Sequence, residues 1–246
     1  MAAFWVNTAA TCALNLLCHY GLGLLVRYRN VRVNYTRKAG FFAAMFLQLA
    51  AMNVLPYDRT PLTVLLRIML LVSILAIYVR PVRERIRFIR ISFLSFDRPE
   101  DRPNTLLWLS TQYFAAYLVL IPMAAIFIRH GYGQLVMIPI LVVIFGDGLA
   151  EPVGIRFGKH RYKTGALFSK KRYERSLEGS ACVWLSGVIA ILCYRAHFDP
   201  HQLYVALVFV PLLMALVEAV SPHTWDAPLL YLAGFCPLLF IIAFIS

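Results

Sequence analysis

Charged residues are scarce in this 246-residue chain, at 15% of the total, whereas hydrophobic residues make up 61%. A soluble domain typically carries about 25% charged and about 50% apolar residues. Here the apolar residues lie in long runs, and a run of roughly 18 or more can cross the hydrocarbon core of a bilayer as a helix. The composition therefore excludes an ordinary soluble domain and predicts a polytopic membrane protein.

Motifs that mark soluble catalytic domains are also absent. The chain has no GxxxxGK[ST] loop, no kinase-type HRD or DFG set, and no HExxH spacing among its six histidines. Its five cysteines all lie inside apolar runs without a CxxC pair, so we expect neither a disulfide framework nor a cysteine metal site. We find no internal repeat and expect no cleavable signal peptide. Any phosphoryl transfer would take place outside a soluble nucleotide-binding fold.

Eight apolar runs are present instead, and we expect each to form a membrane helix. They lie at approximately residues 3–26, 39–55, 60–79, 105–128, 132–150, 178–194, 202–220 and 227–245. The last run contains Pro228 and Pro237, but proline is tolerated in membrane helices. The predicted fold is therefore all-α, a bundle of about eight transmembrane helices.

The basic residues are distributed unevenly among the connections between these runs. Twenty of the 24 lysines and arginines fall in three connections, at 27–38, 80–102 and 156–175. Lysine and arginine are retained on the cytoplasmic side of a membrane, so these three connections should be cytoplasmic. Both termini of this multi-pass protein are then expected on the non-cytoplasmic side.

The segment from Arg80 to Phe96 combines arginines with apolar residues such as Ile86, Phe88 and Ile91. It is too charged to span a bilayer but apolar enough to lie on one. We expect an interfacial amphipathic helix held by anionic lipid head groups. An alternative is that some of its arginines also face a phosphate-bearing substrate.

Five of the twelve acidic residues lie at or near the expected cytoplasmic ends of spans five to eight. They are Asp147, Glu151, Glu178, Glu218 and Asp226. Ionisable groups at membrane depth cost several kcal/mol unless they are paired or coordinated, which makes them functional candidates. Asp147 and Glu151 are four residues apart and share one helical face. Two carboxylates so close suit a hard cation such as Mg²⁺, although pairing with nearby basic residues is the simpler interpretation.

Residues 154–179 form a run of 26 residues that contains eight basic residues and four glycines, GIRFGKHRYKTGALFSKKRYERSLEG. We expect residues 151–177 to form a flexible cationic loop that closes over a polyphosphate. Ser176 should cap the helix that follows, and the amides of such a helix end favour anions. The alternatives are that the charges only set the topology and that Ser176 is only a cap.

Three motifs in the second half of the chain resemble those of a known family. GDGLAEPVGIRFGK at 146–159 resembles the GDGLAD-x-VG-x-RFGK stretch of phytol kinases, which are related to dolichol kinases and more distantly to phosphatidate cytidylyltransferases. RSLEGS at 175–180 is similar to the family's KS-x-EGS element. VEAVSP at 217–222, followed by Asp226, is similar to a third element, VEA-x-SP followed by a DN pair.

The resemblance covers residues 140–230 well and the N-terminal half only weakly. Arg37 and Lys38 match the start of an N-terminal RK-x-x-H element, but Phe41 stands where histidine is expected. Ala227 likewise replaces the asparagine of the third element. These departures leave the choice of substrate open.

The resemblance implies a CTP-dependent kinase of a membrane-dissolved isoprenoid alcohol such as phytol, geranylgeraniol, farnesol or a polyprenol, with Mg²⁺ as cofactor. A water-soluble nucleotide arrives from the cytoplasm and the alcohol through the bilayer, so we expect the active site at the cytoplasmic helix ends. The implied partners are the bilayer and these two substrates. No nucleic acid is expected, and a homodimer stays open.

We assign site residues on this basis. Asp147, with Glu151 or Glu178, would hold Mg²⁺ on the CTP phosphates, and Glu218 or Asp226 would orient or deprotonate the alcohol. Phosphate charge would be neutralised chiefly by Lys159, Lys170, Lys171 and Arg175. The motifs further imply nucleotide contacts from Arg37, Lys38, Gly148, Gly154, Arg156, Gly158, Ser176, Gly179 and Ser221. The expected organisation is an N-terminal three-helix region at 1–104 and a catalytic membrane domain at 105–246.

Three other functions remain open at this point. A cytidylyltransferase would use the same CTP and metal but would form a CDP-lipid and pyrophosphate. A diacylglycerol kinase would differ only in its alcohol. A transporter of anionic solutes could also use intramembrane acids and a basic vestibule, but such folds usually carry an inverted repeat, which we do not find.

Overall fold

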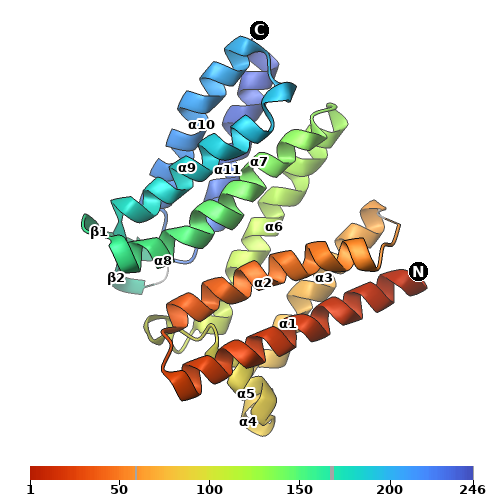
Figure 1. Cartoon of the computed structure of the whole chain (residues 1–246), viewed down its shortest axis with the longest axis vertical. Coiled ribbons are helices and arrows are strands. Elements are labelled where there is room, and N and C mark those ends of the chain that lie inside the picture. The colour runs from red at the N-terminus through yellow and green to blue at the C-terminus, as the bar shows by residue number, and fades with distance from the viewer. Residues whose placement is uncertain (59, 167–168, 246) are drawn as a thin grey trace. The chain divides into compact units, whose positions relative to one another are not determined.

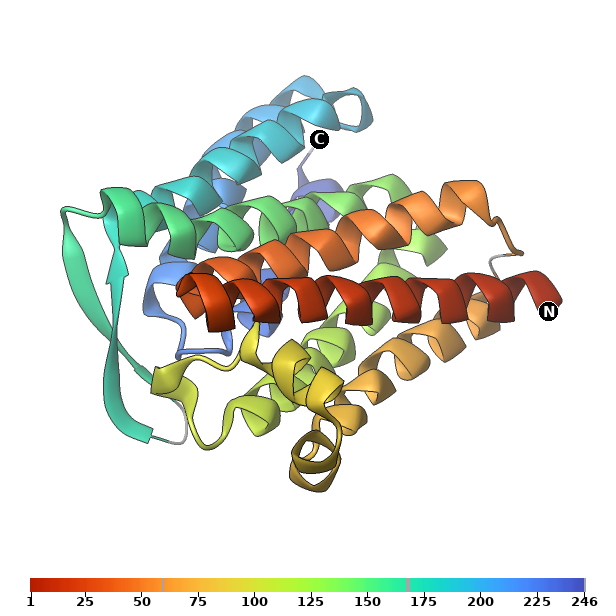
Figure 2. The same ribbon diagram turned by 60° about the horizontal axis from the view of Figure 1, so that its bottom comes forward.

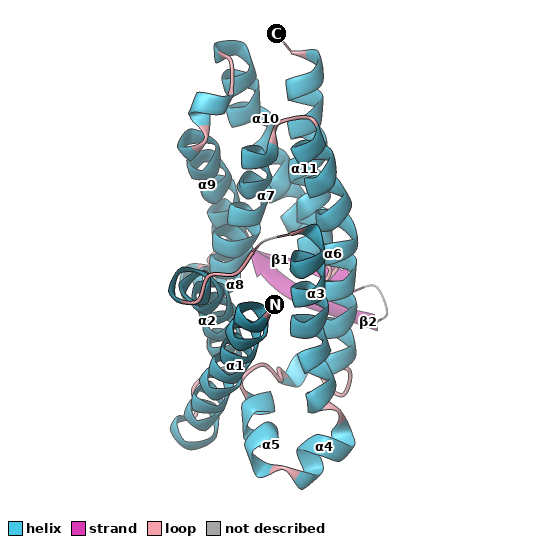
Figure 3. Ribbon diagram, turned by 90° about the vertical axis from the view of Figure 1, so that its right-hand side faces the viewer, coloured by secondary structure: helices cyan, strands magenta, loops and turns pink. Residues whose placement is uncertain are grey.

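The computed structural model describes residues 1–58, 60–166 and 169–245, without the side chains of residues 169–171. The chain divides into two compact units, Met1–Ser110 and Thr111–Ser246 (Figure 1). Helices dominate both units, and one two-stranded sheet is the exception within the described residues (Figure 3). The prediction of an all-α polytopic membrane bundle is confirmed.

Unit 1 contains three long helical segments followed by short ones. In chain order these are α1 (Ala2–Arg29), α2 (Val33–Val54), α3 (Pro61–Ser73) with its continuation η1 (Ile74–Tyr78), α4 (Arg80–Arg85), α5 (Arg87–Leu94) and η2 (Pro99–Asp101). The helix α1 packs along α2 and also against α5 (Figure 2). Thr60 caps α3 by accepting a hydrogen bond from the Thr63 amide, and Pro61 occupies the first helical position, where its missing N–H costs nothing.

The segment expected to be one interfacial helix forms the two short helices α4 and α5 instead. Its apolar side chains Ile89, Ile91 and Phe93 are buried inside unit 1. Gly23 of α1 lets α5 pack closely against α1, because any Cβ at this position would collide with the backbone of Ile91. Part of the apolar face therefore packs against protein, whereas Ile86 is exposed, and the placement of this segment on a bilayer stays a prediction.

Arg67, the one basic residue that the sequence places inside a span, is buried in unit 1. Its guanidinium donates to the side-chain oxygen of Asn7 and, at 3.1 Å, to the Thr11 hydroxyl. The Asn7 amide in turn donates to the backbone oxygens of Ala51 and Leu55, at 2.7 and 2.6 Å. Arg67 thus belongs to a polar cluster that satisfies carbonyls at the C-terminal end of α2.

Unit 2 contains most of α6 (Thr105–Arg129), which begins in unit 1, and all later elements. These are η3 (Gly133–Val136), α7 (Met137–Leu141), the π-helical turn η4 (Val142–Asp147), α8 (Gly148–Phe157), β1 (Arg161–Ala166), β2 (Ser169–Ser176), α9 (Leu177–Cys193), η5 (Arg195–His197), α10 (Pro200–Val220) and α11 (Asp226–Phe244). The helix α9 packs against α10, α8 and η4, and α10 packs against α11. Their contacts form one hydrophobic core that includes Val142, Val183, Met214 and Phe235.

Six helices among the described residues are long and apolar enough to cross a membrane. They cover Ala2–Arg29, Pro61–Tyr78, Thr105–Arg129, Gly133–Phe157, Pro200–Val220 and Asp226–Phe244. The other two expected spans also form helices, but α9 has only 17 residues and α2 includes the charged pair Arg37 and Lys38. The number of spans and the side on which the termini lie therefore stay predictions.

The segment 151–177, expected as a flexible loop, is largely ordered. Residues up to Phe157 continue α8, and β1 pairs antiparallel with β2. Tyr162 lies opposite Arg175, and Thr164 lies opposite Tyr173. Because neighbouring residues of a strand point to opposite faces, these four side chains share one face of the sheet. The loop prediction is wrong for the described part of this segment.

Candidate functional site

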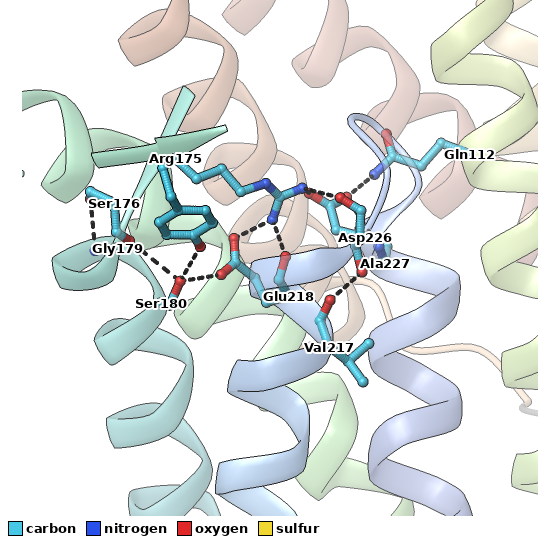
Figure 4. Close-up of polar contacts among 11 residues, drawn as sticks. Gln112, Arg175, Ser176, Gly179, Ser180, Val217, Glu218, Asp226 and Ala227 are labelled. Carbon is cyan, nitrogen blue, oxygen red and sulfur yellow. Dashed lines mark hydrogen bonds and ion pairs between the residues drawn. The ribbon is translucent and has the colours of Figure 1, made fainter. Parts of the chain in front are cut away.

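Arg175 on β2 is the centre of a polar network at the end of unit 2 that carries the three motif segments (Figure 4). Its Nη1 donates to the carboxylate Oε1 and to the backbone oxygen of Glu218, in the last turn of α10. Its Nη2 donates to the backbone oxygen of Ser221 at 3.3 Å and lies 3.6 Å from Oδ2 of Asp226. A cation at this place satisfies carbonyls that a helix C-terminus leaves without partners.

Glu218 is buried, with 4% of its surface exposed, and both of its carboxylate oxygens have partners. Oε1 pairs with Arg175, and Oε2 accepts a hydrogen bond of 2.7 Å from the Ser180 hydroxyl. The Ser180 oxygen also lies 2.7 Å from the Tyr162 hydroxyl. A buried carboxylate is stable only when it is paired in this way. The Ser180 side chain on α9 thus links Tyr162 on β1 to Glu218 on α10.

Asp226, the first residue of α11, joins the network from another direction. Its Oδ1 accepts hydrogen bonds of 3.1 Å from the Gln112 side chain on α6 and from the backbone N–H of Ala227. Ala227 is buried and stands where the family pattern has asparagine, so its side chain supplies no amide at this point.

The charges around Arg175 extend to Asp147. Burial alone would lower the pKa of Arg175, but the neighbouring carboxylates of Asp226, Glu218 and Asp147 hold it above its usual value. Residues from the three motif segments therefore lie near one guanidinium, and the roles assigned to Asp147, Arg175, Glu218 and Asp226 stay predictions.

Asp147 ends the π-helical turn η4 and precedes the first residue of α8. Glu151 follows one turn later, and both side chains are half-buried. Single π-helical turns inside α-helices are frequent at functional sites, because the extra residue re-aims the side chains beside it. This turn was not expected, since the sequence around Gly146 carries no signal for it.

Glu178 does not join Asp147 and Glu151. Its carboxylate accepts hydrogen bonds from the backbone N–H groups of Lys159 and His160, at 3.0 and 3.3 Å, and lies 2.9 Å from the His160 ring nitrogen. It thereby ties the start of α9 to the residues before β1. No group of three or more acidic, histidine or cysteine side chains is placed to hold a metal among the described residues. Of the two partners predicted for Asp147 at a metal ion, Glu178 is occupied by these contacts before β1.

Ser176 and three motif glycines have packing roles. The Ser176 hydroxyl accepts a hydrogen bond of 3.1 Å from the Gly179 amide, which caps α9 and occupies one N–H expected to face an anion. A Cβ on Gly154 or Gly158 would lie 2.8 Å from the Ser176 side chain, and one on Gly179 would lie 2.7 Å from the Ala150 carbonyl oxygen. These glycines let α8 lie directly against the start of α9.

The remaining predicted residues are dispersed. Arg156 and Lys159 are exposed, Gly148 is buried in α8, and the Ser221 hydroxyl donates to the Val217 carbonyl oxygen. The side chains of Lys170 and Lys171 lie outside the described part of the structure. Arg37 and Lys38 belong to unit 1, where Lys38 is buried, and the Phe41 ring contacts Phe42 edge-on.

Three residues of the network were missed by sequence reasoning. Ser180 follows Ser176 by one helical turn within the RSLEGS motif, which was the available signal. Gln112 is a polar residue inside an apolar span, a pattern that should itself have indicated a functional role. Tyr162 gave no signal, because its place opposite Arg175 depends on the unexpected sheet.

The residues present fit a magnesium ion that is bound mainly by nucleotide phosphates, and they do not fit an ion held by protein ligands alone. A closed protein cage would need more ligands than converge here, but Mg²⁺ bound to nucleotide phosphates commonly takes only one or two carboxylates. Asp147 and Glu151 could supply these from one helical face.

Comparisons with protein-family models, curated proteins and solved structures find no match to this chain.

Proposed function

We propose that this chain transfers the γ-phosphoryl group of CTP to the hydroxyl group of an isoprenoid alcohol dissolved in the membrane. The observation that carries the proposal is the network around Arg175, which joins three segments far apart in the sequence. Those segments are the ones whose motifs resemble the lipid-alcohol kinases. A buried network of charges at the ends of apolar helices has a free-energy cost that function can explain.

The location of the network suits a reaction between a soluble and a membrane-dissolved substrate. The helices α9, α10 and α11 are apolar over most of their length, and their charged residues gather at one end of each, near the sheet. A nucleotide can reach this end from water, and a lipid alcohol can reach it along the helices without leaving the bilayer.

We assign the catalytic roles according to the contacts of each residue. Glu218 has both carboxylate oxygens occupied, so we assign it to positioning Arg175 and Ser180 instead of to proton transfer. We assign the proton-acceptor role to Asp226, because its carboxylate is half-buried at the start of α11 and its Oδ2 lies 3.6 Å from the Arg175 guanidinium. Arg175 supplies fixed positive charge toward the phosphates.

In the proposed reaction the alcohol oxygen attacks the γ-phosphorus of CTP, and the bond between that phosphorus and the β,γ-bridging oxygen breaks. The hydroxyl proton passes to Asp226, and the products are CDP and a lipid monophosphate. Asp147 and Glu151 would hold Mg²⁺, which would neutralise charge on the phosphates when bound. Positioning and charge stabilisation supply most of the catalysis in reactions of this kind.

The test is turnover by the purified chain with CTP, Mg²⁺ and a panel of phytol, geranylgeraniol, farnesol, a polyprenol and diacylglycerol. We expect an isoprenoid monophosphate as product, and we expect Asp147→Asn to lower turnover at least about 100-fold because it removes a carboxylate beside the phosphates. Glu174→Gln, on the exposed side of the sheet, is the matched control and should keep wild-type turnover. Near-normal turnover of Asp147→Asn, with the fold intact, would contradict the assignment.

A further inference from the structure

Two tyrosines lie beyond the network, toward the apolar middle of the helices. One is on α11, which begins with Asp226, and the other is on α6, whose Gln112 donates a hydrogen bond to Asp226. Tyr117 follows Gln112 by five residues on α6, and Tyr231 follows Asp226 by five residues on α11. Gln112 and Asp226 are hydrogen-bonded, so both tyrosines lie about 7.5 Å deeper along their helices at a rise of about 1.5 Å per residue. The two residues are therefore at the same depth.

The two helices stay in contact beyond this level. Phe127 of α6 and Phe235 of α11 pack with ring centroids 5.4 Å apart, so along the helices the tyrosines lie between two levels at which side chains of α6 and α11 make contact. Tyr231 is buried, with 9% of its surface exposed, and Tyr117 is half-buried. Helical side chains tilt toward the N-terminus, so both phenol groups lie closer to the level of Gln112 and Asp226 than their own Cα atoms do.

Asp147 lies near Tyr231. Its carboxylate lies within electrostatic range of the Tyr231 phenol, and Tyr231 in turn lies within range of Tyr117. The turn η4, which ends at Asp147, packs against α11. The two phenols therefore lie near Asp147, whose charge also acts on Arg175.

The hydroxyls of Tyr117 and Tyr231 are the unexplained polar groups near Asp147. Within the described chain no hydrogen bond joins either hydroxyl to another residue, whereas Tyr162 and Ser180 at the network are both bonded. A phenol in apolar surroundings normally finds a partner, because leaving it without one costs free energy. A neutral hydroxyl can both donate to and accept from these phenols, and a hydrocarbon chain would suit the apolar helices beyond them.

We propose that Tyr117 and Tyr231 bind the hydroxyl group of the lipid alcohol and hold it beside Asp147 and Asp226. The inference rests on the proposed function and adds to it the residues that select an alcohol as acceptor. They are binding residues, since no proton is transferred to either phenol in the reaction.

The kinetic experiment compares Tyr117→Phe and Tyr231→Phe with wild type in lipid nanodiscs. Each substitution removes one oxygen and keeps the ring, so the fold should be retained. The KM for geranylgeraniol should rise about 3- to 10-fold per substitution, the effect of one lost hydrogen bond, while the KM for CTP stays unchanged. Tyr204→Phe, on α10 with 72% of its surface exposed, is the matched control and should leave both constants unchanged.

A binding experiment separates this inference from the proposed reaction. Geranylgeraniol and its methyl ether compete with a photoreactive geranylgeraniol analogue, and protein labelling is measured without nucleotide. Wild type and Tyr204→Phe should be protected better by the alcohol than by the ether, and the two phenylalanine variants should lose this preference. Loss of preference supports the inference even if wild type shows no phosphoryl transfer, in which case only the proposed function fails. Unchanged preference in both variants would overturn the inference even in an active kinase.

Discussion

At the scale of single residues, the pairing of Arg175 with Glu218 explains why charges persist at the ends of apolar helices. Each carboxylate oxygen of Glu218 has a donor, and the guanidinium also binds the backbone of the turn after α10. A buried ion pair of this kind is a poor source of net stability, but each partner depends strongly on the other.

A pair of substitutions tests this dependence. Arg175→Met leaves the Glu218 carboxylate buried without its cation, so we expect a loss of about 3–5 kcal/mol in the free energy of unfolding. Adding Glu218→Leu should recover part of that loss, because the buried charge is then gone. Denaturation of the purified chain in mixed micelles measures both effects. A double variant less stable than the sum of the two single variants would contradict the pairing.

Residue types alone predicted part of the site. Asp147, Glu218 and Asp226 could be selected because carboxylates at membrane depth are costly, and the structure gathers them around Arg175. Glu178 met the same criterion but turns to the residues before β1. The sequence could not distinguish the two outcomes, because the direction of Glu178 depends on the path of the chain between α8 and β1.

At the scale of elements, glycines set how closely α9 approaches its neighbours. A Cβ on Gly146 would lie 2.9 Å from the Cα of Val183, and one on Gly179 would meet the Ala150 carbonyl oxygen. The motif glycines were predicted to face a nucleotide, since glycine next to basic residues is typical of phosphate-binding loops. In the structure, Gly146, Gly154, Gly158 and Gly179 instead lie against other residues of unit 2, too close for a side chain.

Substitution of Gly179 with alanine tests the packing role. The added methyl group would lie too close to a backbone oxygen, so we expect a loss of about 1–3 kcal/mol in the free energy of unfolding. Gly21→Ala on α1 is the matched control, because nothing lies within 4 Å of its added Cβ. There alanine should be neutral or stabilise the helix by up to about 1 kcal/mol. Equal behaviour of the two variants in thermal denaturation would argue against the close approach of α9 and α8.

The sheet of β1 and β2 shows why periodicity was insufficient for this element. The stretch from Arg161 to Thr164 alternates charged residues with Tyr162 and Thr164, which fits a strand, but it is short and followed by Gly165. The buried face of the sheet can be identified only from tertiary contacts, such as the stacking of Tyr173 of β2 on His223 with ring centroids 3.6 Å apart. Long apolar runs, by contrast, predicted most long helices to within about three residues. The exceptions are α2, which begins at Val33 instead of residue 39, and the segment expected at 132–150, which continues to Phe157 and is divided into η3, α7, η4 and α8.

At the scale of the whole molecule, the distribution of basic residues predicts the sidedness of the protein. The sheet should be cytoplasmic, and both termini should lie on the opposite side. We expect Lys163→Cys, in a chain whose native cysteines are replaced with serine, to react with a membrane-impermeant maleimide only from the cytoplasmic face. Ala2→Cys is the matched control and should react only from the other face. Labelling of both positions from the same face would contradict the topology.

The fate of the two phosphates of labelled CTP tests the proposed function most directly. Purified protein is incubated with geranylgeraniol, Mg²⁺ and CTP labelled either at the γ- or at the α-phosphate, and the lipid fraction is counted. Phosphoryl transfer predicts label in the lipid from γ-labelled CTP alone, with CDP released. In a parallel incubation with a lipid monophosphate in place of the alcohol, lipid label from the α-phosphate with release of pyrophosphate would instead identify a CDP-lipid-forming enzyme. Absence of lipid label across the whole panel of alcohols would contradict the proposal.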